Sequence, residues 1–248
     1  MKKRPVSLGF LFSNWSGRSN CQEIMDSGEI DPVMLTRTFD HLKTINLYLS
    51  GIRKLILKTI LMDVSVRKLK NITVIELGCG GGEIARWLSG VCAKRNIGCI
   101  LTCIDNNEIA VRYARRECID CGNIEVKHID AFEALKSHRA DYIYANHFLH
   151  HLKDETIVPL LQLMAESACY GFLINDLYRS PLSLLAFSLT APFFRGSYAV
   201  ADGKISIRKG FTEREMRNLG ESINRKGISI VKRSSPGHLS LWFRQSDR

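Results

Sequence analysis

A glycine-rich turn between an apolar run and an amphipathic run limits the possible folds more than any other feature. Residues 74–88 read VIELGCGGGEIARWL, and four glycines fall within residues 78–82. Glycine loses more conformational entropy on folding than any other residue, so such a run is costly unless the backbone needs its freedom. The pattern predicts a strand that turns abruptly into a helix, with a ligand lying close to the backbone of the turn.

The rest of the chain alternates between short β-branched runs and helical periods. Strands are expected at 72–77, 99–105, 124–130, 141–146 and 170–176, and helices at 83–95, 107–118, 155–168 and 212–227. Two further strands, ISIVKRS and LSLWFRQ, flank SPG as a closing hairpin. This alternation predicts an α/β fold with a mostly parallel, doubly wound sheet and one antiparallel strand.

Two segments stand outside this alternation. Asp31-Pro32 is typical of a helix start, and apolar residues then recur at threes and fours up to Ile60, with Gly51 dividing the run. Residues 1–70 are therefore expected to form a helical cap over the ligand site, and 71–248 the main domain. Residues 181–211 are interpreted as an apolar insertion followed by a polar loop or strand, with a lid at about 180–210.

Charge and cysteine content narrow the class of protein. The 248 residues carry a net charge of +10, and the basic residues are dispersed without interleaved aromatics, which disfavours nucleic acid as a partner. The basic, apolar N-terminus is too short and broken for a signal peptide, so it is interpreted as mature chain. Eight cysteines without a zinc-type second pair beside Cys118-x-x-Cys121 indicate no metal site and a reduced, cytoplasmic location.

Polar residues end four of the expected parallel strands. They are Glu76, Asp105, Asp130 and Asn146. Open α/β sheets bind ligands at the carboxyl ends of their strands, and an acid at the end of the second strand is where ribose hydroxyls are held. A nicotinamide enzyme is the nearest rival, but no glycine occupies position 83 and the chain closes with a hairpin.

VIELGCGGGEIARWL, CIDNNEIAVRYAR, HIDAFE and YIYANHFLHHL resemble the consecutive motifs of class I S-adenosylmethionine-dependent methyltransferases over roughly residues 70–178. The similarity is greatest to the small-molecule branch that includes ubiquinone and menaquinone methyltransferases, and the N-terminal helices resemble the leader of polyketide-associated bacterial methyltransferases. The resemblance implies a Rossmann-like seven-stranded sheet in the order 3-2-1-4-5-7-6, with the last strand antiparallel. It also implies S-adenosylmethionine as cofactor and S-adenosylhomocysteine as product.

The resemblance also assigns cofactor contacts. The turn Gly78, Cys79, Gly80 and Gly82 would run under the amino-acid part of the cofactor, with Glu76 near its amino group. Asp105 and Asn106 would hold the ribose, and Asp130 and Ala131 the adenine. The remaining cofactor candidates are Asn146, Asn46 and Arg53, the last two for the cofactor carboxylate.

Three histidines follow the fourth strand and are candidates for the base that deprotonates the acceptor: His147, His150 and His151. Of these, His147 is expected to face the cofactor most directly, and His150 and His151 to point along the turn. The acceptor is expected to be a hydrophobic, aromatic small molecule such as a phenol, quinone or polyketide, methylated on oxygen or on activated carbon. The apolar lid also permits peripheral membrane contact. An RNA methyltransferase and a cofactor-binding regulatory protein without turnover stay open as alternatives, and the oligomeric state is not predicted.

Overall fold

The computed structural model describes residues 15–26, 31–235 and 237–246. Seven strands form one sheet in the order β3-β2-β1-β4-β5-β7-β6. They are β1 (Asn71–Leu77), β2 (Gly98–Asp105), β3 (Ile124–His128), β4 (Ala140–Asn146), β5 (Ala168–Leu177), β6 (Gly227–Ser235) and β7 (His238–Gln245). The first five pair in parallel, and β7 pairs antiparallel with both β5 and β6, so the predicted order and the antiparallel last strand are confirmed.

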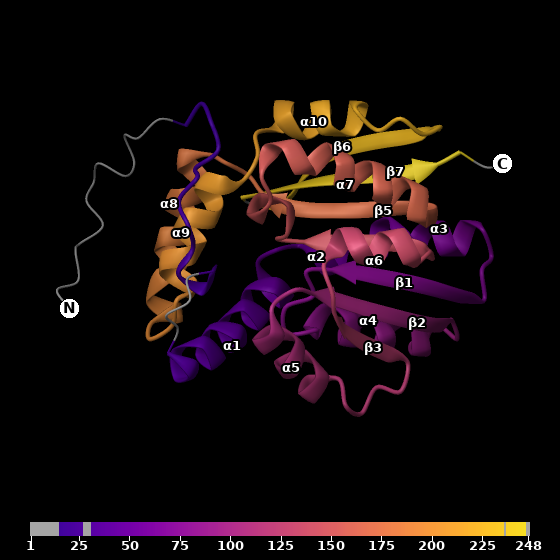
Figure 1. Cartoon of the computed structure of the whole chain (residues 1–248), viewed down its shortest axis with the longest axis horizontal. Helices are drawn as coiled ribbons and strands as arrows, with labels where there is room; N and C mark the ends of the chain where they lie inside the picture. Colours follow the sequence, from indigo (N-terminus) through magenta and orange to yellow (C-terminus); the bar gives the residue numbers. More distant parts are fainter. Residues whose placement is uncertain (1–14, 27–30, 236, 247–248) are drawn as a thin grey trace.

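Helices cover both faces of the sheet (Figure 1). One face packs against α2 (Ile52–Lys58), α3 (Ile60–Val66), α4 (Glu83–Lys94) and α5 (Glu108–Glu117). The other packs against α6 (Ala131–Ser137), α7 (Asp154–Ser167) and α10 (Glu213–Glu221). Both faces of the central strands are therefore covered, and β1 and β4 are buried along most of their length.

Local sequence explains where several helices begin. The side chains of Asn107 and Asp130 accept backbone N–H groups at the starts of α5 and α6. Thr212 and Glu215 form the expected capping box of α10. That helix ends at Glu221 and not near 227, since the chain must turn there to enter β6.

For residues 181–211 the sequence predicted an apolar insertion followed by a polar loop or strand. The second part of this prediction is wrong, because that part of the segment is helical. The segment forms α8 (Pro181–Thr190), the 3-10 turn η4 (Ala191–Phe194) and α9 (Ala199–Lys209). Gly203 lies inside α9, where a Cβ atom would come within 2.4 Å of the Phe187 ring of α8. The glycine thus lets the two helices pack closely, and this tertiary contact outweighs its poor helix propensity.

The carboxyl ends of the parallel strands are covered by α1 (Pro32–Tyr48), α8 and α9, which lie together on one side of the sheet in Figure 1. Residues 15–26, which include the 3-10 turn η2 (Ile24–Asp26), run along α9 and are called the strap below. Ser19 N–H donates to the Arg208 carbonyl, and the Asp202 carboxylate accepts the N–H groups of Ile24 and Met25. Within the described residues, no helix has the length and apolar character needed to cross a bilayer.

Candidate active site

The glycine turn after β1 adopts left-handed backbone angles that other residues rarely tolerate. Gly78, Gly80 and Gly82 have φ values of 65°, 51° and 75°. A Cβ atom at Gly78 would lie 2.4 Å from the Phe148 ring, whereas a Cβ at Gly80 would meet nothing within 4 Å. The turn is thus closely packed on one side, and Gly80 leaves open space beside the backbone on the other.

A cavity of about 690 Å³ opens beside this turn, at the carboxyl ends of the strands. Its polar end is formed by Gly78, Gly80, Asp105 and Asp130, at the ends of β1, β2 and β3. Its other end is lined by apolar side chains of α1, α8 and α9 together with residues of the strap: Leu42, Ile45, Phe187, Ala199, Ile207 and Met25. One cavity therefore joins a polar edge of the sheet to an apolar wall, a volume and character suited to small-molecule ligands.

Asp105 connects β2 to the glycine turn. Its Oδ2 accepts the Gly80 N–H at 2.9 Å and its Oδ1 accepts the Asn107 N–H at 2.9 Å. Burial raises the pKa of this carboxyl, although these backbone N–H groups oppose the shift. A carboxylate offers about four acceptor positions, so two remain for a ligand in the cavity.

At the neighbouring strand end, Asp130 caps α6 by accepting the Phe132 N–H at 2.8 Å, and Ala131 beside it is buried in the cavity wall. Asn106 also lines the cavity, and its carbonyl bonds the His128 ring at 3.0 Å. These positions form the part of the wall where the sequence analysis placed the ribose and adenine.

A chain of polar side chains crosses the sheet edge between α1 and β5. Asn175 Nδ2 donates to Asn146 Oδ1 at 2.8 Å, Asn146 Nδ2 donates to Asn46 Oδ1 at 3.0 Å, and Asn46 Nδ2 donates to Glu83 at 2.5 Å. Asn46 and Asn146 both line the cavity, so this network fixes the side chains at its floor.

Two buried acids lie near this network. Burial raises the pKa of Glu76 well above its usual range, and the negative charge of Glu83 raises it further. Burial also raises the pKa of Glu83, partly offset by the Asn46 amide. The raised pKa means that the protein favours the neutral form of Glu76, and Glu76 lines the cavity. A cationic ligand group beside it would favour the carboxylate form.

The histidines after β4 occupy three different environments. His150 is buried, and its Nδ1 lies 2.7 Å from Asp176 Oδ1, while its backbone N–H donates to the same carboxylate at 3.2 Å. Burial alone would raise the pKa of Asp176, but the adjacent His150 ring lowers it below the usual range. The carboxylate orients the ring with Nδ1 toward Asp176 and Nε2 on the side of Glu23.

His147 has φ = 52°, a strained angle for a non-glycine residue, and its Nε2 lies 2.7 Å from Nε2 of His238. Burial, followed by the positive charge that His238 can carry, lowers the pKa of His147 well below its usual range. His151 is partly exposed, with a side chain 35% accessible. The His150 ring is thus hydrogen-bonded to a carboxylate, that of Asp176.

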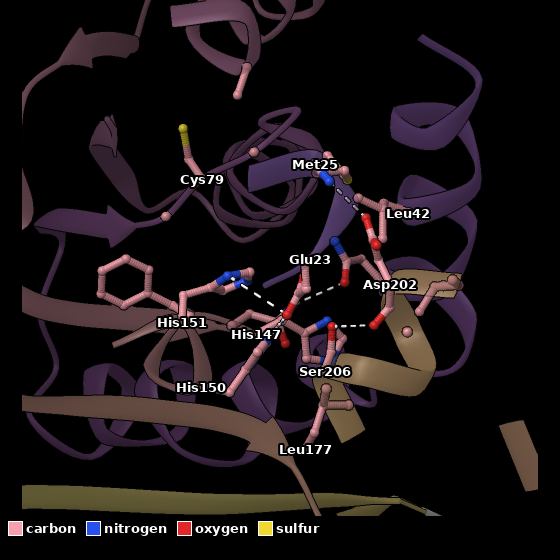
Figure 2. A pocket seen from close by; sticks show the side chains of 18 of the residues that line it. Glu23, Met25, Leu42, Cys79, His147, His150, His151, Leu177, Asp202 and Ser206 are labelled. Atoms are coloured by element: carbon pink, nitrogen blue, oxygen red, sulfur yellow. Dashed lines mark hydrogen bonds and ion pairs between the residues drawn. The ribbon is translucent and has the colours of Figure 1, made fainter. Parts of the chain in front are cut away.

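The strap adds a residue that the sequence analysis did not single out. Figure 2 shows the Glu23 carboxylate pointing between His150 and His151, and its Oε1 lies 3.8 Å from His150 Nε2 and 3.9 Å from His151 Nδ1. Two imidazoles and a carboxylate can hold a divalent cation. However, the Lys209 ammonium lies 3.1 Å from the same oxygen and would compete with such a cation, so the cluster is already balanced in charge.

Two predicted cofactor residues do not line the cavity. The guanidinium of Arg53 lies 4.9 Å above the Trp87 ring, because α2 packs against the face of the sheet and not over its edge. Gly82 forms the N-cap of α4, where its carbonyl faces Cys118 Sγ at 3.8 Å. The other predicted residues, including Cys79 and all three histidines, do line it.

Comparisons with known proteins agree with this geometry. A family model described as a methyltransferase domain matches residues 74–168. None of the curated proteins compared with the chain matches it in sequence.

Three solved structures show a similar fold. The plantazolicin methyltransferase BpumL, in complex with a triazolic desmethylPZN analog and SAH, aligns with a TM-score of 0.65 at 13% identity, over 88% of this chain and 92% of that one. A SAM-dependent methyltransferase from Aquifex aeolicus gives 0.56 at 15%, over 88% and 100%. Magnesium protoporphyrin IX methyltransferase from Synechocystis PCC 6803, with bound SAM, gives 0.54 at 13%, over 89% and 100%.

Proposed function

We propose that the chain is a class I S-adenosylmethionine-dependent methyltransferase and that it methylates a hydroxyl group of a hydrophobic, flat small molecule, with His150 as the base. The observation that carries the proposal is the continuity of the cavity. It runs from the glycine turn and Asp105 to the apolar walls of α1, α8 and α9, and His150 also lines it.

The polar end fits the cofactor, which supplies a methyl group on a positively charged sulfur. We propose that the two free acceptor positions of Asp105 hold the ribose hydroxyls and that Gly78 and Gly80 let the cofactor approach the backbone. Glu76 and the network through Asn46 and Asn146 would receive the ammonium and carboxylate ends of its amino-acid part. Asp130 and Ala131 would border the adenine.

The apolar end fits the acceptor. A phenolic oxygen beside His150 Nε2 would give its proton to this nitrogen while it bonds the methyl carbon, and the sulfur keeps the electron pair of the broken bond. Asp176 on one side and Glu23 on the other would stabilise the imidazolium that forms. Orientation of the two reactants in a closed cavity supplies on the order of 7–11 kcal/mol of the barrier.

The similar structures support a small acceptor, since BpumL is crystallised with a triazolic desmethylPZN analog. All eight cysteines, which lie within the described residues, are free thiols, and this supports a reducing, cytoplasmic location.

Transfer of labelled methyl groups to a panel of phenols and quinols, run beside total RNA at two salt concentrations, tests the proposal. His150→Gln should lower kcat about 10²- to 10⁴-fold, the usual contribution of a general base, without weakening S-adenosylhomocysteine binding. His138→Gln, in a histidine bonded at the end of α6 outside the cavity, is the matched control. Salt-sensitive labelling of RNA alone, or full activity of His150→Gln, would contradict the proposal.

A further inference from the structure

The helix α8 carries a row of apolar side chains on its outer face. Leu182, Leu185, Leu189 and Phe193 of the following turn are 74%, 49%, 71% and 80% exposed. Their spacing of three to four residues places the three leucines along one side of the helix, and we call the four residues the α8 patch. Single exposed apolar residues are ordinary, but four adjacent ones on a short segment indicate a contact surface.

The same helix also forms a wall of the cavity. Ser183, Ala186, Phe187 and Thr190 line the cavity, so α8 separates its interior from the α8 patch. Figure 1 places α8 and α9 at the edge of the molecule, away from the sheet. Whatever binds the α8 patch therefore lies next to the acceptor end of the cavity.

Two arginines lie near the end of the α8 patch, and the exposed acid Asp31, whose backbone N–H donates to Tyr198 Oη, lies in the same region. Residues 181–201 contain a single charged residue, Arg195, which is exposed and follows Phe193 closely. Arg37 of α1 is also exposed, and its guanidinium lies next to Gly196, 3.2 Å from where a Cβ atom would stand. The whole chain has a net charge of +10. An apolar face bordered by arginines is complementary to a surface with anionic groups above hydrocarbon.

We propose that the α8 patch docks this protein on an anionic lipid surface, with Leu182, Leu185, Leu189 and Phe193 in the acyl boundary and Arg37 and Arg195 among the headgroups. The ten-residue helix is too short to span a bilayer and lies along its surface. Docking holds the α8 wall of the cavity against the membrane, which is the phase in which a hydrophobic acceptor accumulates. The inference rests on the proposed function only for this last step.

Sedimentation of the full chain with phosphatidylcholine vesicles, with and without about one third phosphatidylglycerol, tests the docking surface. We expect binding to the anionic vesicles that weakens with salt. Phe193→Asp and Leu189→Asp should each lower the partition coefficient about tenfold, because each removes an apolar side chain from the acyl boundary. Arg37→Gln and Arg195→Gln should each lower it about fivefold on anionic vesicles only.

Ile119→Asp is the matched control. Ile119 is 79% exposed in the turn after α5, at the opposite end of the sheet, and the variant should bind vesicles like the unmodified chain. Unchanged S-adenosylhomocysteine affinity in every variant shows that the fold is intact.

Failure of the unmodified chain to bind anionic vesicles, or equal loss in Ile119→Asp and Phe193→Asp, would overturn the inference. So would a dimer that Phe193→Asp dissociates, because the α8 patch would then bind a second copy. Vesicle binding needs no acceptor and no turnover, so a negative result leaves the proposed methyl transfer standing.

Discussion

Replacing Asp105 tests the proposal that the end of β2 holds the cofactor. Its two oxygens each accept one backbone N–H, from Gly80 and Asn107, and leave two acceptor positions for ribose hydroxyls. Asp105→Ala removes both proposed hydrogen bonds to the ribose hydroxyls and also removes the acceptor of the Gly80 N–H in the glycine turn. Charge-assisted hydrogen bonds contribute about 1.5–3 kcal/mol each. Since a vacated site recovers part of this through water, we expect S-adenosylhomocysteine binding to weaken by about 2–4 kcal/mol, or roughly 30- to 1,000-fold.

Asp105→Asn separates the two contributions, because the amide keeps one acceptor oxygen and presents an N–H₂ group to a backbone donor. Its loss of affinity should be smaller than that of the alanine variant. Calorimetric titration with S-adenosylhomocysteine measures both, and Asp120→Ala, in an exposed acid after α5, is the control. The melting temperature of each variant without ligand, measured alongside, shows how far loss of the hydrogen bonds from Gly80 and Asn107 also destabilises the fold.

The proposed role of Asp105 is refuted if Asp105→Ala binds S-adenosylhomocysteine with an affinity within about threefold of that of the unmodified chain, a difference below 1 kcal/mol. It is also refuted if the affinity of the unmodified chain rises as the pH falls. Protonation removes acceptor capacity, and a raised pKa brings this protonation to a higher pH, so the affinity of the unmodified chain should fall on acidification while that of Asp105→Ala stays flatter.

Three other changes give separate tests. Asp176→Asn should lower kcat about 10²- to 10⁴-fold, because it releases the His150 ring, with S-adenosylhomocysteine affinity kept; an equal loss of affinity would speak against a role through His150. Burial raises the pKa of Glu76 in the folded state, so its stabilising contribution is present at low pH and is lost as pH rises through that pKa. Urea unfolding should accordingly show Glu76→Gln gaining stability over the unmodified chain between about pH 5 and about pH 8, and a constant difference would contradict this. Gly78→Ala, at φ = 65° with a ring 2.4 Å from the new Cβ, should destabilise the fold by about 1–3 kcal/mol in the same assay, whereas Gly122→Ala, in open space, should be neutral.

The sequence predicted the regular part of the fold because its signals are local. The glycine turn after 72–77 and the Thr212–Glu215 capping box each act within a few residues, and the structure shows them where they were expected. The helix α9 was missed because Gly203 and β-branched residues disfavour a helix locally. Tertiary contacts such as that of Gly203 with Phe187 of α8 compensate, and no local pattern contains them.

The residues of the site also fall into two groups, those that a local sequence rule predicts and those that depend on contacts between distant parts of the chain. Asp105 and Asn146 line the cavity because they end parallel strands, which places them at one edge of the sheet. Asp176 ends β5 by the same rule and could have been found from it. Glu23 could not, because its position depends on the path of the strap.

The path of the strap is fixed by contacts between distant parts of the chain. Arg18 donates to the carbonyls of His150 and Leu152 and pairs with Asp154, and Arg179 donates to the carbonyl of Trp15. Neither arginine has a sequence signal that names its partner, so the position of Glu23 follows only from the folded chain.

The buried charges of this site are hard to explain by stability alone. Glu23, His150, Asp176 and Lys209 are all at least nine-tenths buried, and desolvation of such groups costs several kcal/mol per ion, which pairing offsets only in part. Apolar residues of similar size would pack the same space at no such cost. A carboxylate on each side of one imidazole does, however, favour the moment at which that ring receives a proton. If His150 is the base, as we propose, the fold gives up stability at the place where a hydroxyl group would be activated, and buried charged groups are typical of such functional sites.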